Sequence, residues 1–420
     1  MLAVRSQRAF LFVCAATFGT YMAQGLLYPA LPLYLTTELG TTKAMAGLVV
    51  SSLSIAGLSG RVWAGPVIDR RGRKPVILAG TALVAASGVG LALVGSVAGV
   101  LAMRLLQGLG GALGYSAAAA MVADLAPPEQ RTRYLARFGV FFYVGFALGP
   151  WLAEALIGSF GFTSVWWAVV AFAGAGAVVA STLPETGGSA GTAAAGTAGT
   201  AAAAAARVGI RRRMFHPAAV PAGIVFLCVG VGWTAISSFL ALYAREIGLG
   251  SSDGLFIVLS ITVVAIRPFA GNLAERFGKI AVLVPSVALC TIAMTVLAAV
   301  RAPLPTYVAL AMYGAGFSAL FPVLFSIVVD RAPDRERATA MSSFNVFFDI
   351  GAPIGGYGVG ALVDVGGFGL GFGVMAVFAA AGGLALLNVA RSESEDDAPL
   401  DFPRRPPRQP RNPPRRQQAA

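Results

Sequence analysis

The chain alternates long apolar stretches with short polar or charged segments. Each apolar stretch is long enough for a helix of about 20 residues to cross a bilayer, and twelve such spans are expected. They cover about residues 9–35, 45–68, 75–97, 99–123, 136–158 and 163–183, and then about 218–243, 254–274, 280–300, 304–329, 340–363 and 368–390. The pattern predicts an all-α integral membrane protein with twelve transmembrane helices.

A charged segment after the second span recurs after the eighth span, 206 residues further on. Asp69 and Gly72 correspond to Glu275 and Gly278 at this offset. The motif Asp-x-Ala-Pro at 124–127 recurs at 330–333 with the same offset. The repeat predicts two pseudo-symmetric six-helix bundles, and internal duplication of this kind is typical of secondary transporters.

The same features divide the chain into four parts. We expect an N-terminal bundle over 1–184, a cytoplasmic linker over 185–217, a C-terminal bundle over 218–391 and a tail over 392–420. The linker is rich in Gly, Ala, Ser and Thr, which is typical of a mobile connection. The tail is rich in Pro and Arg and cannot bury a core, so we expect it to be disordered.

Composition and charge place the protein in a membrane. Only 12% of the residues are charged and 57% are apolar, whereas soluble domains carry about 25% charged residues. Most of the 31 lysines and arginines lie in the N-terminus, alternate loops and the tail. This asymmetry predicts a multi-pass plasma-membrane protein with both termini in the cytoplasm. The net charge of +12 therefore reflects membrane orientation and predicts no nucleic-acid partner.

The first charged segment reads Gly-x-x-x-Asp-Arg-x-Gly-Arg-Lys over 65–74 and resembles the signature of the major facilitator superfamily. The likeness covers nearly the whole chain. It implies that Asp69, Arg73 and Asp124 form a charge network that latches the two halves together in an outward-open state. The implied latch residues of both copies are Gly65, Asp69, Arg70, Gly72, Arg73, Lys74, Asp124, Gly271, Glu275, Arg276, Gly278 and Asp330. The alternative is an ordinary solvated basic loop.

Arg104 and Gln107 lie inside the fourth span, in a sequence that resembles the family's R-x-x-Q-G motif. A guanidinium group at this depth must face protein or a watery cavity, because its transfer into lipid is costly. The resemblance implies a role for Arg104 in proton coupling. The alternative is a packed arginine whose donors are satisfied by Gln107 and backbone carbonyl groups.

Gly145, Gly149 and Pro150 in the fifth span resemble the G-x-x-x-G-P antiporter motif of the drug-exporter branch. The family pattern continues to a Gly-Gly pair, where this chain has Ala153 and Glu154. Small residues four apart also allow close helix packing in any membrane protein, so ordinary packing remains the alternative.

Two acids lie within spans, Glu154 near an outer end and Asp349 deeper in the eleventh span. Both are candidate proton carriers, because a carboxyl group in a medium of low dielectric constant favours its neutral form. The alternatives are contact with interfacial water for Glu154 and pairing with a buried arginine such as Arg267 for Asp349. Asp364 lies at a span end and is expected to be a solvated loop residue.

A polar and aromatic stripe formed by Thr17, Tyr21, Gln24 and Tyr28 follows one face of the first span. Together with Trp233 and Asn345, these residues are candidates for a substrate cavity. Hydrogen bonding between helices is the alternative.

The combined patterns predict a secondary active transporter that exports small organic molecules in exchange for protons by alternating access. The alternative is an importer or facilitator of a small polar metabolite. A membrane enzyme or sensor is not indicated, because the sequence has no recognisable nucleophile motif, metal-spaced ligands or phosphate-binding loop. We therefore expect a monomer that contacts lipid, protons and a small-molecule substrate, uses no cofactor and draws on the proton gradient.

Overall fold

The computed structural model describes residues 2–127, 130–186, 215–333 and 336–396, which form helices and connecting turns. The first half contains α1 (Leu2–Thr37), α2 (Lys43–Arg71), α3 (Arg73–Leu93), α4 (Val97–Leu125), α5 (Arg131–Phe160) and α6 (Phe162–Ser181). The second half contains α9 (Val220–Glu246), α10 (Asp253–Phe277), α11 (Lys279–Ala299), α12 (Pro303–Arg331), α13 (Arg337–Pro353), the π-helical turn η2 (Ile354–Gly358) and α14 (Val359–Asp396). Most of the expected linker and tail lie outside the described residues.

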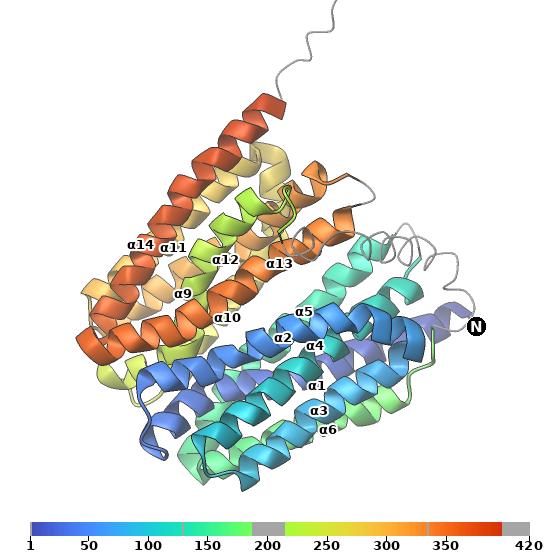
Figure 1. Cartoon of the computed structure of the whole chain (residues 1–420), viewed down its shortest axis with the longest axis horizontal. Helices are drawn as coiled ribbons and strands as arrows, with labels where there is room; N and C mark the ends of the chain where they lie inside the picture. The colour runs from blue at the N-terminus through green and yellow to red at the C-terminus, as the bar shows by residue number, and fades with distance from the viewer. Residues whose placement is uncertain (1, 128–129, 187–214, 334–335, 397–420) are drawn as a thin grey trace, which may run out of the picture.

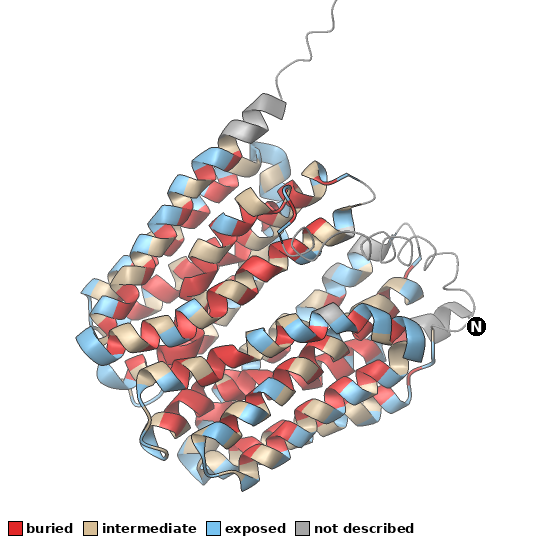
Figure 2. Ribbon diagram, viewed as in Figure 1, coloured by how far each residue is buried: buried red, intermediate tan, exposed pale blue. Residues whose placement is uncertain are grey.

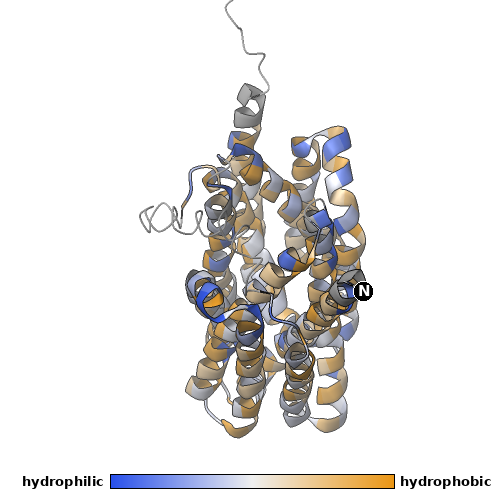
Figure 3. Cartoon of the chain, turned by 90° about the vertical axis from the view of Figure 1, so that its right-hand side faces the viewer, coloured by the Kyte–Doolittle hydropathy of each residue, from blue (hydrophilic) through white to orange (hydrophobic). Residues whose placement is uncertain are grey.

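Eleven helical stretches of the described chain are long and apolar enough to cross a membrane. The last stretch, Thr339–Ala390, has 52 residues, enough for two crossings, and its backbone breaks at Gly367, where φ is 73°. This break lies between the eleventh and twelfth expected spans. Hydrophobic residues follow the helices over most of their length (Figure 3). The expectation of an all-α membrane protein is confirmed.

The helices form two bundles, α1–α6 and α9–α14 (Figure 1). Buried residues lie mainly on the helix faces that are turned toward other helices (Figure 2). The bundles lie close together at one end and diverge toward the end that carries the N-terminus (Figure 1). We call the latter the basic end; it also carries the turns that follow α2, α4, α10 and α12. The other end is called the opposite end.

Equivalent helices of the two bundles pack in the same way. A Cβ atom added to Gly108 of α4 would meet the carbonyl oxygen of Leu53 on α2 at 2.4 Å. One added to Gly314 of α12 would meet the carbonyl oxygen of Leu259 on α10 at 3.0 Å. Gly314 and Leu259 lie 206 residues after Gly108 and Leu53, respectively. The expected pseudo-symmetry is therefore present in the packing and not only in the sequence.

The small residues of α5 bring this helix close to α1. A Cβ atom on Gly149 would lie 2.6 Å from the Cα atom of Gly25, and one on Gly145 would lie 2.8 Å from the carbonyl oxygen of Phe18. Pro150 follows inside the same helix. The candidate packing residues thus form a backbone-to-backbone contact, which a larger side chain would separate.

This contact predicts that Gly149→Ala destabilises the protein relative to Gly158→Ala. The methyl group at 149 collides with backbone atoms, which cannot rotate away as a side chain can, and such overpacking costs about 1–3 kcal/mol. Gly158 lies on the same helix and has no neighbour within 4 Å, so it controls for the change in helix propensity. The thermal unfolding midpoints of the two purified variants test this, and equal midpoints would contradict the close approach of α1 and α5.

Candidate functional site

The basic end carries two equivalent turns, each built on a glycine. Gly72 joins α2 to α3 with φ 87° and ψ 170°, and Gly278 joins α10 to α11 with φ 90° and ψ 151°. This backbone region is essentially restricted to glycine. Each turn therefore reverses the chain within one residue and brings the start of the next helix close to the charges around it.

Each turn is followed by an ion pair within its own bundle. Arg73 Nε lies 3.1 Å from Asp124 Oδ2, and Lys279 Nζ lies 2.8 Å from Asp330 Oδ2, with both members offset by 206 residues. Asp69 is exposed and forms neither a hydrogen bond nor an ion pair among the described residues. The implied network of Asp69, Arg73 and Asp124 is therefore only partly formed in this conformation, in which the bundles diverge at the basic end (Figure 1).

Glu185 is an additional member of this cluster that the sequence reasoning missed. Its carboxylate accepts hydrogen bonds from the backbone N–H groups of Arg73 at 2.9 Å and Lys74 at 3.1 Å. A carboxylate at this position stabilises the start of α3, because the first N–H groups of a helix lack partners and carry partial positive charge. The available signal was an acid directly after the sixth span.

The remaining latch candidates make few contacts in this conformation. A Cβ atom at Gly65 or Gly271 would have open space around it. The side chains of Arg70, Glu275 and Arg276 are exposed. The structure thus places the predicted latch at one end of the molecule, with its within-bundle pairs formed.

At the opposite end, the second bundle caps a helix of the first. Asp364 of α14 accepts hydrogen bonds from the backbone N–H groups of Lys43 at 3.0 Å and Ala44 at 2.9 Å, at the start of α2. The expectation that Asp364 is simply a solvated loop residue was wrong. Its side chain is exposed, but it joins the two bundles by an N-terminal helix cap.

A second acid joins the bundles in an equivalent way. Glu154 of α5 accepts a hydrogen bond from the hydroxyl of Ser252, which directly precedes α10. Glu154 is buried, so the alternative of interfacial water was wrong. In each half, an acid near the end of the fifth span bonds to the start of the second span of the other half. These two contacts close the opposite end.

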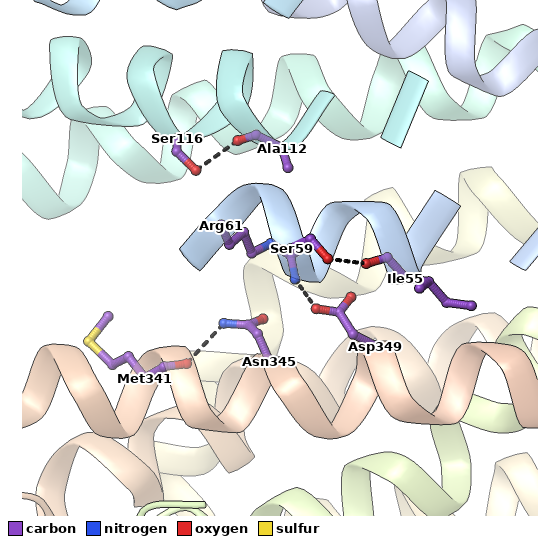
Figure 4. A network of polar contacts seen from close by, with 8 residues as sticks. All are labelled: Ile55, Ser59, Arg61, Ala112, Ser116, Met341, Asn345 and Asp349. Atoms are coloured by element: carbon purple, nitrogen blue, oxygen red, sulfur yellow. Dashed lines mark hydrogen bonds and ion pairs between the residues drawn. The ribbon is translucent and has the colours of Figure 1, made fainter. Parts of the chain in front are cut away.

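Asp349 forms an ion pair across the two bundles at the level of the spans (Figure 4). Its partner is Arg61 of α2, and not Arg267 as the sequence suggested. The carboxylate of Asp349 is 3% exposed, whereas the side chain of Arg61 is 44% exposed. Arg61 lies ten residues before the end of α2, about 15 Å along the helix. Asn345 is one turn from Asp349 and donates to the carbonyl oxygen of Met341 at 3.0 Å.

The repeat places a second arginine at the bundle interface, and this arginine meets an aromatic ring where Arg61 meets a carboxylate. Arg267 of α10 corresponds to Arg61, and Tyr143 of α5 corresponds to Asp349, both at the offset of 206. The guanidinium carbon of Arg267 lies 4.0 Å from the centroid of the Tyr143 ring and 5.3 Å from that of Phe321. The two arginines thus reach across the interface from equivalent positions, Arg61 to the carboxylate of Asp349 and Arg267 to the ring of Tyr143.

Arg104 is enclosed by protein. Its side chain is almost completely buried and donates hydrogen bonds to the Gln107 side chain and to the carbonyl oxygen of Val50 at 3.2 Å. Among the described atoms, Arg104 Nε and Gln107 Nε2 lack a hydrogen-bond partner. These contacts match the packing alternative, and a role in proton coupling stays a prediction.

The stripe of α1 packs against α5 of its own bundle, and Tyr28 also packs against the core of the second bundle. Thr17, Tyr21 and Gln24 are buried, and Tyr28 is half-buried. The rings of Tyr21 and Tyr28 contact α5, with centroids 4.1 Å from Phe142 and 4.6 Å from Phe146. Helix packing therefore accounts for most of this stripe, and its part in substrate binding stays a prediction.

Aromatic side chains from three helices form a continuous set that crosses the bundle interface, and we call it the aromatic belt. It consists of Phe142, Tyr143 and Phe146 on α5, Phe226 and Trp233 on α9, and Phe317 and Phe321 on α12. Trp233 stacks on Phe317 at 4.7 Å and lies 6.4 Å from Phe146 of the other bundle. Only Trp233 was a sequence candidate, because helical periodicity does not reveal which rings of separate helices meet.

Two related helical bundles that meet at one interface are an architecture typical of secondary transporters. The chain belongs to the Major Facilitator Superfamily, whose family model matches residues 13–356 and, in a second match, 223–419. The members of this family are transporters and not enzymes, and the same holds for this chain. The drug-exporter branch is not fixed by this match.

Relatives and solved structures agree with this assignment. An "Uncharacterized MFS-type transporter" of Pseudomonas aeruginosa is 27% identical over 396 residues, which cover 88% of this chain and 90% of the relative. The crystal structure of the nucleoside transporter NupG has a TM-score of 0.74 at 16% identity, covering 90% of this chain and 99% of that one. A peptide-bound POT family transporter has a TM-score of 0.75 at 14% identity, covering 92% and 96%. These structural likenesses show the fold.

The Asp364 cap predicts that Asp364→Ala opens the opposite end. Loss of an N-terminal cap costs about 1 kcal/mol, which corresponds to about a fivefold shift in population toward separated bundles. Glu246→Ala is the control, because Glu246 pairs with Arg301 of its own bundle.

The separation can be measured by electron spin resonance between labels at Met45 and Val365, which are both exposed. We expect longer distances in Asp364→Ala than in the wild type or in Glu246→Ala. Unchanged distances in Asp364→Ala would show that the cap does not hold the bundles together.

Proposed function

We propose that this transporter exports small organic molecules across the plasma membrane in exchange for protons, by alternating access. The observation that carries this proposal is the ion pair between Arg61 and Asp349, which joins the bundles within the spans. A proton on Asp349 would neutralise the carboxylate and weaken the contact. Proton occupancy and the relative position of the bundles would then be linked, as coupled transport requires.

The proposed orientation follows the positive-inside rule, with both termini and the basic end in the cytoplasm. The conformation described above is then closed toward the outside by the Asp364 and Glu154 contacts. In the proposed cycle, a proton reaches Asp349 from outside and leaves toward the cytoplasm, where the pair with Arg61 re-forms. Substrate travels in the other direction between the same two conformations.

The exporter direction is supported by the antiporter-like sequence of α5, where Gly145 and Gly149 pack on α1 directly before Pro150. The second candidate is an importer or facilitator of a small polar metabolite. It is supported by the likeness to the nucleoside transporter NupG and to the peptide-bound POT family transporter. For either direction, we propose that one chain works as a monomer with no cofactor beyond the proton gradient.

Asp349→Asn should abolish coupling to the pH gradient, because the amide cannot carry a proton. A compound to which the protein confers resistance is first found in a strain that lacks its own efflux pumps. Its accumulation is then followed in everted vesicles with an acidic interior. We expect the wild type to accumulate the compound. The control Glu38→Gln, which alters an exposed acid, should do the same. Asp349→Asn should show no accumulation that depends on the pH gradient.

The same vesicles separate the two directions of transport. An exporter accumulates the compound in the acidic interior, and a protonophore abolishes the accumulation. A proton-coupled importer would instead empty preloaded vesicles under the same gradient, and that outcome would overturn the proposed direction. Gradient-driven accumulation by Asp349→Asn would remove this residue from the coupling mechanism.

Asp69→Asn should lower the transport rate without lowering stability. Asp69 is exposed and forms no hydrogen bond or ion pair with the described residues, so its neutralisation should change the free energy of unfolding by less than about 0.5 kcal/mol. Its charge is expected to act only when the bundles close at the basic end. Transport assays and thermal unfolding of the same preparation test this, and an unaltered transport rate would remove Asp69 from the latch.

A further inference from the structure

The charges within the spans are unequally matched at the bundle interface. Arg61 is paired with Asp349, and Arg104 is enclosed by Gln107 and a backbone carbonyl group. Among the described residues, Arg267 forms no ion pair with a carboxylate. A positive charge at this depth is costly unless a partner neutralises it. The interface therefore favours an anion beside Arg267.

The aromatic belt begins and ends at this arginine. Tyr143 lies against the guanidinium from the first bundle and Phe321 from the second. Between them, successive ring centroids are separated by 4.7 Å at Tyr143–Phe142, 6.0 Å at Phe142–Phe146, 6.4 Å at Phe146–Trp233, 4.7 Å at Trp233–Phe317, 6.0 Å at Phe317–Phe226 and 5.5 Å at Phe226–Phe321. Apart from Phe226 and Phe317, these rings are only partly buried. Aromatic surface is therefore accessible beside the charge.

We propose that Arg267 and the aromatic belt form a binding site for aromatic organic anions, which are the substrate class of the proposed transport. Two rings cover the guanidinium, but its five N–H donors lie in the plane of the group and can bind a carboxylate through two hydrogen bonds. The ring of the ligand would stack in an offset or edge-to-face manner on the belt. An organic cation is disfavoured by repulsion from Arg267.

The position of this site links it to alternating access. The contact of Arg267 with Tyr143 and that of Phe146 with Trp233 both cross the bundle interface. Rocking of the bundles must change both distances, so the affinity for a ligand held by these groups differs between the two conformations. Such a difference is the condition for a substrate to bias the equilibrium. An inside-negative membrane potential also drives an anion outward, in the proposed direction.

The repeat explains why the free charge lies at Arg267. Arg61 and Arg267 are equivalent, but the position of Asp349 is taken by Tyr143 in the other half. At this level of the interface, the described residues set Arg61 and Arg267 against one carboxylate, that of Asp349, while Glu154 lies further along α5 and bonds to Ser252. A ligand carboxylate would restore the balance of charge there.

Four probes test charge and aromaticity separately. We would measure binding of 1-naphthoate, 1-naphthamide, 1-naphthylmethylammonium and cyclohexanecarboxylate to the purified full-length protein by calorimetry. Because a hydrogen-bonded charge pair is lost with the amide, 1-naphthoate should bind about tenfold or more tightly than 1-naphthamide. The ammonium compound and the saturated carboxylate should bind more weakly than 1-naphthoate. Equal binding of 1-naphthoate and 1-naphthamide, or tighter binding of the ammonium compound, would overturn the proposal.

Variants then assign the effect to Arg267. Arg267→Gln should bind the carboxylate and the amide equally, with binding of the amide retained as evidence of a folded belt. Arg245→Gln alters an exposed arginine of α9 and should keep the wild-type preference. A tenfold preference for 1-naphthoate that persists in Arg267→Gln would refute the role of this residue, whatever its stability. The wild-type probe series remains decisive if the variant does not fold.

This inference rests on the proposed transport function, and the two can fail separately. Proteoliposomes that move 1-naphthoate without response to a pH gradient would support the binding site and overturn proton coupling. The opposite outcome is that proteoliposomes move a cationic dye such as ethidium in response to the pH gradient, and that 1-naphthoate neither binds nor competes with the dye. This result would support coupled export and overturn the anion site.

Discussion

The arrangement of the two bundles depends on the ion pair between Arg61 and Asp349, because among the described residues it is the pair of opposite charges that joins them. Charges in a membrane must be matched within the protein, since lipid offers no hydrogen bonds. When the arginine and the carboxylate of such a pair belong to different bundles, the relative position of the bundles determines whether the two charges are in contact. A proton on the carboxylate, or an anionic ligand beside the arginine, changes the attraction between the two groups and therefore the relative stability of the bundle arrangements.

The other polar contacts divide by location. At the basic end, Arg73–Asp124 and Lys279–Asp330 lie within single bundles and can persist while the bundles rock. At the opposite end, Asp364 and Glu154 bond to the start of helices in the other bundle and must separate when that end opens. Capping of a helix start is suited to this role, because the released N–H groups and carboxylates can each be hydrated.

The sequence predicted several features that arise within one bundle, although it missed the contact of Glu185 with the start of α3. Apolar length predicted the spans, and the offset of 206 placed Gly72 with Gly278 and Asp124 with Asp330. It was not sufficient for contacts between bundles. The partner of Asp349, the cap formed by Asp364 and the ring contacts of Phe146 depend on how two rigid bodies dock, and neither helical periodicity nor charge spacing contains that information. The repeat pairs Arg61 with Arg267, but it does not specify which group each arginine meets.

The departures from symmetry are as informative as the repeat. Positions that the packing requires, such as Gly108 and Gly314, are the same residue in both halves. Charged positions within the spans are conserved between the halves at Arg61 and Arg267, but Asp349 corresponds to Tyr143 and Arg104 to Leu310. A doubled scaffold needs equal packing to form two similar bundles, but a substrate and a proton are not related by that symmetry. Chemistry that acts on them must break it, and the unequal partners of Arg61 and Arg267 lie where the two bundles meet.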